Sequence, residues 1–183
     1  PFTDPGKPDT RTPLRFLLWI ARLQWTTLLA GVTFGVIWMV SQALMPAAIG
    51  RAIQKGVVDS DNQALVKWSL ILLGLGATTA AAGVMRHRCA VSNWLPASFR
   101  MAQIVAHHAA RTGPAIKKGH STGEVVATVS NDAMRAGGAF DITARLAGAI
   151  VSYIVVAIIL LSSSVTLGLV VLVGVPVLVL LMG

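Results

Sequence analysis

The sequence predicts an all-α fold, a polytopic membrane helical bundle with long cytoplasmic helix extensions. Of its 183 residues, 55% are hydrophobic and only 12% are charged, whereas roughly 25% are charged in an ordinary soluble domain. Asp, Glu, Lys and Arg are absent from residues 23–50, 68–85 and 146–183. A membrane helix needs about 20 mostly apolar residues, so we expect one span in each of the first two stretches and two short spans in the third.

The net charge of +8 would favour nucleic-acid binding in a soluble protein. Here the basic residues flank the apolar stretches, which favours membrane lipids as partners and no nucleic acid. Cys89 is the single cysteine and cannot form an intrachain disulfide. The chain begins with Pro1 and ends at Gly183 inside an apolar run, so we expect a piece of a longer protein, cropped in its fourth span.

Residues 1–13 contain four prolines and scattered charges, a composition that opposes a regular helix, so we expect a flexible N-terminal tail. Residues 14–23 set Arg15 and Arg22 against apolar neighbours. This pattern is typical of a short amphipathic helix in the membrane interface. We favour that interpretation over the alternative, in which these residues are the first turns of the following span.

We place the four spans at about residues 24–48, 64–85, 146–161 and 165–183. Gly31 and Gly35 in the first span have the GxxxG spacing that permits close helix contact, although a chance pair in a Gly-rich chain explains them equally well. Pro46 is compatible with a helix that is finishing there. We expect the polar residues 51–67 and the serines 162–164 to form the two outer connections.

Between the second and third spans, residues 86–145 form a long excursion outside the membrane. The residues after Met85 are mostly helix formers, so we expect the second span to continue as a helix that kinks at Pro96. The helix should break at residues 112–114, and a second break is expected at residues 120–123.

A further helix should then lead back to the membrane. Ser121 or Thr122 is suited to cap it, with Glu124 in its first turn. We expect this helix to run into the third span, with Gly137-Gly138 as a weak point.

The distribution of basic residues predicts the orientation of the chain. Four of the 15 Lys and Arg precede the first span, eight lie between the second and third spans, and three lie in residues 51–67. Cytoplasmic loops carry an excess of Lys and Arg. We therefore expect a multi-pass protein of the cell (inner) membrane, with a cytoplasmic N-terminus and a cytoplasmic excursion.

Taken in order, these features resemble the N-terminal part of the transmembrane domain of an ATP-binding-cassette (ABC) exporter with six spans per half. An elbow helix over residues 14–23, a first span ending with Pro46 to Gly50, and a long second helix are similar to that family's order. Thr122-Gly123-Glu124 with Asp132 downstream resembles the family's Gly-Glu/Asp…Asp pattern after the first cytoplasmic loop. The resemblance covers residues 14–183.

The resemblance implies that the tip of the excursion is a coupling helix in a groove of a nucleotide-binding domain. By position, that helix comprises Thr112, Gly113, Pro114, Ala115, Ile116, Lys117, Lys118 and Gly119. It also implies a homo- or heterodimer of two halves, with ATP and Mg²⁺ on nucleotide-binding domains outside this segment. The family often has an aromatic pair where Ile116 and Lys117 stand, and Ser-Arg where Ala127 and Thr128 stand, so the docking contacts differ.

Catalytic signatures are not found in the sequence. It contains no GxxxxGK[ST] phosphate-binding loop, so ATP hydrolysis by this protein would lie beyond Gly183 or on another chain. His107 and His108 are adjacent and would point about 100° apart on a helix. We therefore expect a solvated helix face there and no metal site.

Polar side chains within the spans are few and not ionisable, which favours a cavity for amphipathic or lipid-like cargo over a proton pathway. The cavity candidates are Gln42, Thr78, Thr79, Arg86, Arg88 and Tyr153. The intramembrane candidates could instead bond only between helices. Arg86 and Arg88 could anchor the second helix to anionic headgroups or line an inward-facing mouth that attracts anionic cargo.

The leading hypothesis is the membrane domain of an ATP-driven exporter, which moves a small amphipathic cargo by alternating access. The alternative is a membrane anchor and dimerisation stalk of a bacterial signalling protein. A small pore of four spans is a third hypothesis, but it leaves the long excursion unexplained.

Overall fold

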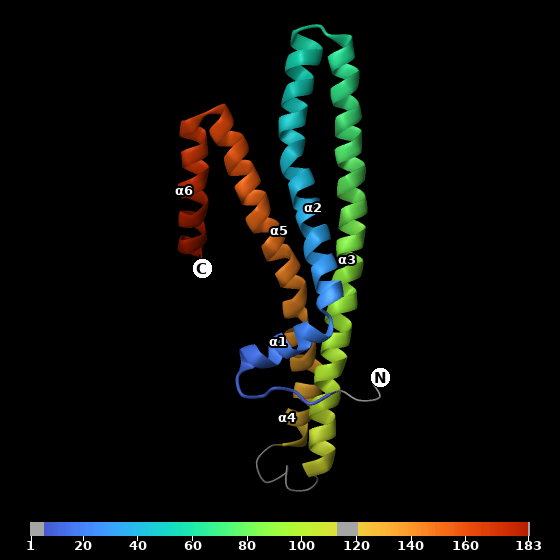
Figure 1. The fold of residues 1–183 in the computed structure, drawn as a ribbon. Helices are drawn as coiled ribbons and strands as arrows, with labels where there is room; N and C mark the ends of the chain where they lie inside the picture. The colour runs from blue at the N-terminus through green and yellow to red at the C-terminus, as the bar shows by residue number, and fades with distance from the viewer. Residues whose placement is uncertain (1–5, 113–120, 183) are drawn as a thin grey trace. The chain divides into compact units, whose positions relative to one another are not determined.

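The computed structural model describes residues 6–112 and 121–182, and this part of the chain is helical without any strand (Figure 1). The elements in chain order are α1 (Pro13–Leu23), α2 (Trp25–Arg51), the π-helix η1 (Ala52–Val58), α3 (Asn62–Thr112), α4 (Thr122–Ala127), the π-helix η3 (Thr128–Asp132), α5 (Ala133–Ser163) and α6 (Val165–Met182). The predicted all-α fold is confirmed.

Within the described residues, three helical runs are long and apolar enough to cross a membrane. They are Trp25–Val58, Asn62–Thr112 and Gly123–Ser163. Gly168–Met182 is a shorter apolar helix that follows them. Ser164 alone separates α5 from α6, at the place where the sequence predicts a tight turn of serines.

Local chemistry explains where α1 begins and ends. The Thr12 side chain accepts a hydrogen bond of 3.2 Å from the Arg15 backbone N–H, and Pro13 suits the first turn because its missing N–H has no helical partner there. The helix ends at Leu23, and the next residue, Gln24, leaves helical geometry at φ −132°. α1 thus starts one residue before the predicted residues 14–23.

The first apolar helix does not finish at Pro46. α2 continues to Arg51 and is followed directly by η1, so that only residues 59–61 are non-helical before α3. α2 itself ends close to the expected end of the first span, but helical structure continues beyond it, because a proline removes only its own N–H donor and the later residues still bond along the helix. Asp61 then caps α3, accepting hydrogen bonds from the backbone N–H groups of Gln63 and Ala64.

The longest element is α3, which contains 51 residues and includes Pro96. At about 1.5 Å per residue, a helix of that length measures roughly 75 Å. This is more than twice the hydrocarbon thickness of a bilayer, which is about 30 Å. The predicted extension of the second span into a long helix is therefore present.

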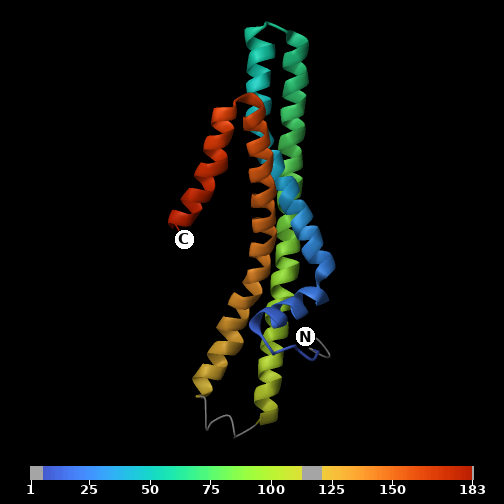
Figure 2. The same ribbon diagram turned by 60° about the vertical axis from the view of Figure 1, so that its left-hand side comes forward.

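The chain divides into two compact units, and α2, α3 and α5 each contribute to both. The first unit comprises residues 1–32 and 85–144, and the second comprises residues 33–84 and 145–183. In the first unit, α1 lies across α3 and α5 (Figures 1 and 2). Its core contains Ile20 of α1, Ala97 and Met101 of α3, and Ala133 and Phe140 of α5.

Candidate functional site

In the first unit, α3 and α5 approach closely at Gly137. A Cβ atom on this residue would lie 2.9 Å from the Trp94 carbonyl oxygen and 3.1 Å from the Ser98 Cβ. The Trp94 indole Nε1–H donates to the Met134 carbonyl at 3.2 Å, which adds a bond between the two helices. The glycine pair is therefore not the weak point we expected. α5 runs through it, and Gly137 is where α3 requires the absence of a side chain.

A buried hydrogen bond joins α2 to α3 in the same unit. The Thr27 hydroxyl donates to the Asn93 Oδ1 at 2.6 Å, and Asn93 is 2% exposed. A buried amide without a partner would cost about 1–3 kcal/mol. The pair therefore fixes how these two helix segments face each other.

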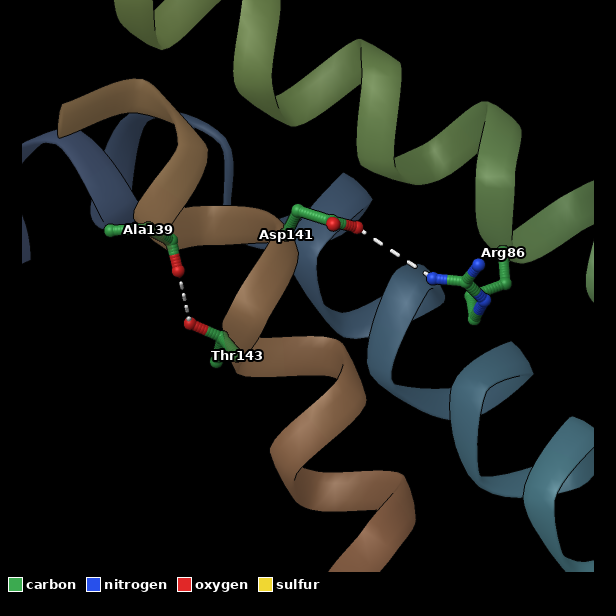
Figure 3. A network of polar contacts seen from close by, with 4 residues as sticks. All are labelled: Arg86, Ala139, Asp141 and Thr143. Carbon is green, nitrogen blue, oxygen red and sulfur yellow. Dashed lines mark hydrogen bonds and ion pairs between the residues drawn. The ribbon is translucent and has the colours of Figure 1, made fainter. Parts of the chain in front are cut away.

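An ion pair joins α3 to α5 farther along the same unit. The Arg86 Nη1 lies 3.6 Å from the Asp141 Oδ1, and the two side chains are 14% and 25% exposed. Figure 3 shows the arginine reaching from α3 toward Asp141 on α5. In the same view, the Thr143 hydroxyl donates to the Ala139 carbonyl at 3.3 Å, which keeps that side chain on its own helix.

Sequence reasoning missed Asp141, although a signal for this pair was present. Arg86 is the first charged residue after the apolar stretch of residues 68–85, and Asp141 shortly precedes the stretch of residues 146–183. Successive spans run in opposite directions, so the two charges belong near the same face of the membrane. Opposite charges at one level of a bundle are usually paired.

The predicted cavity residues fall into two groups. Gln42, Thr78 and Arg88 are exposed in this chain. The Thr79 hydroxyl donates to the Leu75 carbonyl of its own helix at 2.8 Å, and the Tyr153 hydroxyl of α5 donates to the Leu172 carbonyl of α6 at 2.7 Å. Their role as cavity residues stays a prediction.

Arg86 and Arg88 have different environments, although we expected the same role for both. The Arg86 side chain is shielded and paired with Asp141. Arg88 is exposed. Contact with lipid headgroups or with anionic cargo stays a prediction for both arginines.

Glycines also set close helix contacts in the second unit. A Cβ on Gly148 of α5 would lie 2.9 Å from the Gly35 carbonyl oxygen of α2. Gly31 and Gly35 are both buried. The GxxxG spacing therefore includes a real helix contact at Gly35, as small residues do in membrane bundles.

The predicted coupling helix lies almost entirely outside the described residues. Thr112 is the last residue of α3, and residues 113–119 are not among those described. Beyond this segment, Ser121 caps α4 with a capping box, in which its hydroxyl accepts from the Glu124 N–H and the Glu124 carboxylate accepts from the Ser121 N–H. The predicted cap is confirmed at Ser121. Asp132 is exposed at the end of η3.

Metal ligands do not cluster in the described part of the chain. His107 and His108 are both exposed on α3. The absence of a metal site stays a prediction for the whole chain.

The geometry thus consists of long apolar helices joined by small-residue contacts and a few polar bonds. Comparisons of the chain with curated proteins and with solved structures gave no match. The family described as ABC transporter transmembrane region matches residues 24–183, which include every element from α2 to α6. α1 precedes the matched residues, so its role as an elbow helix stays a prediction. The chain is a multi-pass membrane protein and belongs to the ABC transporter transmembrane region family.

Proposed function

We propose that this chain is the membrane part of an ATP-driven exporter that carries an amphipathic small molecule. The observation that carries the proposal is the length of α3, which continues far beyond a membrane thickness as one helix of 51 residues. A helix of that length can pass the movement of a cytoplasmic domain to the membrane as a rigid body. The family match supports a transporter and does not favour the signalling anchor.

In the proposed cycle, two halves form a cavity that opens alternately to the two sides of the membrane. ATP and Mg²⁺ bind to nucleotide-binding domains, and the closure of these domains moves the segment of residues 112–119. The N-terminus and this segment are on the cytoplasmic side. Apolar spans with few ionisable groups suit a cargo that is itself partly apolar.

The experiment that tests this function measures ATP hydrolysis and transport together. The full protein, with its nucleotide-binding domains, is placed in inside-out vesicles, and ATP-dependent accumulation of a fluorescent amphiphile is followed. We expect accumulation with ATP and Mg²⁺ and none with a non-hydrolysable ATP analogue. Equal accumulation under both conditions would contradict an ATP-driven exporter.

A substitution at the tip of the excursion tests the coupling role. Ile116→Asp should reduce transport at least tenfold while the protein still hydrolyses ATP, because a charge would disturb an apolar contact with the nucleotide-binding domain. Ala110→Asp is the matched control, since Ala110 is exposed on the last turns of α3. Unchanged transport and cargo-stimulated hydrolysis in Ile116→Asp would refute the coupling role of this segment.

A further inference from the structure

A cleft of the second unit lies where α2 continues into η1 and faces the end of α5. Its volume is about 370 Å³, within the range of about 300–1,000 Å³ that small-molecule sites occupy. Leu44, Ala47 and Ile159 supply an apolar wall. η1 is a π-helix, a form that occurs frequently at functional sites.

The other side of the cleft is positively charged. Arg51 and Lys55 line it, with Gln54 between them in sequence, and all three side chains are exposed. None of the described residues that line the cleft is acidic. Among the described residues, neither cation forms an ion pair. Like charges four residues apart repel each other, so an anion placed between them would be favoured.

The guanidinium of Arg51 is held in place by an aromatic ring. Its Cζ lies 5.3 Å from the centroid of the Trp68 ring, at the start of α3. Stacking on the face of a ring leaves the N–H groups in the guanidinium plane available to an anion. A tryptophan in this position is also typical of the headgroup level of a membrane.

The two serines that line the cleft already have hydrogen-bond partners. The hydroxyls of Ser162 and Ser163 both donate to the Ile159 carbonyl, at 2.7 and 3.0 Å. The side-chain donors left for a ligand are therefore those of Arg51, Gln54 and Lys55.

We propose that this cleft binds a phospholipid whose headgroup carries a net negative charge. The phosphate lies between Arg51 and Lys55, and the start of an acyl chain packs against Leu44 and Ile159. Arg51 belongs to the helix end that follows the first apolar span, so the bound lipid is in the leaflet opposite the long excursion. The site is independent of the cargo and of ATP, and it stands or fails separately from the transport function.

Native mass spectrometry of the full protein tests the site. The protein is released from detergent in the presence of phosphatidylglycerol or phosphatidylcholine, and the fraction that retains one lipid is measured. We expect the apparent affinity for phosphatidylglycerol to fall roughly ten- to thirtyfold in the double variant Arg51→Gln, Lys55→Gln, since each basic residue near a headgroup contributes about a factor of five. Phosphatidylcholine should bind weakly to both proteins.

The matched control is Arg11→Gln, Lys67→Gln, which removes one arginine and one lysine at exposed positions outside the cleft. Equal losses in the two double variants would overturn the proposal, because the attraction would then be to overall charge. Equal binding of phosphatidylcholine and phosphatidylglycerol by the unaltered protein would also overturn it.

A second variant tests the apolar wall without changing the charge. Ala47→Leu fills part of the cleft and should weaken phosphatidylglycerol binding several-fold, with an unchanged elution volume in size-exclusion chromatography. Unchanged binding would overturn the cleft as the site. Free glycerol phosphate, which has no acyl chain, is tested as a competitor. If it displaces phosphatidylglycerol when both are present at the same concentration, the proposed requirement for an acyl chain is overturned.

Discussion

Replacement of Gly137 by alanine tests the close contact of α3 and α5. The new Cβ would lie 2.9 Å from the Trp94 carbonyl oxygen, 3.1 Å from the Ser98 Cβ and closer still to the Ser98 Oγ. The serine hydroxyl donates to that same carbonyl at 2.8 Å. Since the carbonyl belongs to the helix backbone, α5 must move away from α3 to accept the methyl group.

The adjacent residue, Gly138, supplies a matched control. No heavy atom lies within 4 Å of a Cβ built on it, so Gly138→Ala has only the helix-propensity gain of about 1 kcal/mol. Gly137→Ala has the same gain but also an overpacking cost of about 1–3 kcal/mol. The free energy of unfolding of the two variants should therefore differ by about 1–3 kcal/mol.

Thermal unfolding of both proteins in the same detergent, followed by size-exclusion chromatography of heated samples, measures the difference. The Tm of Gly137→Ala should be lower than that of Gly138→Ala by about 2–12 °C. Adding Ser98→Gly to Gly137→Ala should restore part of the loss, because it removes two of the three close contacts. Equal Tm values for the two alanine variants would refute the close contact of α3 and α5.

Three further outcomes are expected. Asp141→Asn should lower the free energy of unfolding by about 1–3 kcal/mol, because it removes the carboxylate that pairs with the shielded Arg86. Adding Arg86→Gln to this variant should restore most of that stability in the same unfolding assay. Asn93→Ala should lower the free energy of unfolding by about 1–3 kcal/mol in that assay, since the buried hydrogen bond from the Thr27 hydroxyl to the side-chain amide of Asn93 is lost. In a Cys89→Ser background, Asp59→Cys should react with a membrane-impermeant thiol reagent added outside intact cells, whereas Ala110→Cys should not; the reverse pattern would contradict the orientation.

Structural features that depend on residues close together in sequence could be predicted. Ser121 and Glu124 lie three residues apart, and this spacing alone indicates the capping box that the structure contains. The long apolar stretches likewise indicate helices, because only a helix satisfies its own backbone groups in lipid. Helical structure continues past Pro46, because a proline removes only its own N–H donor and the residues after it can still bond along the helix.

The contacts between helices were not predictable in the same way. Gly137 was expected to be a weak point of the helix, and only the position of Trp94 and Ser98 makes it a contact point. The sequence offered Arg86 as a headgroup anchor or a cargo-attracting residue, and only the structure places Asp141 beside it. In both cases the partners are far apart in sequence. The sequence can place Arg86 and Asp141 at the same level of the membrane, but no local pattern predicts which helix faces meet.

The sequence by itself therefore determined that the chain is helical, that it belongs in a membrane and where its helices begin. Only the tertiary structure decided which residues join those helices, such as Asn93 to Thr27 and Gly148 to Gly35. The physical reason is that lipid and protein are equally apolar, so hydrophobicity places a helix in the membrane without choosing its neighbour. Close packing of small residues and a few buried polar bonds make that choice.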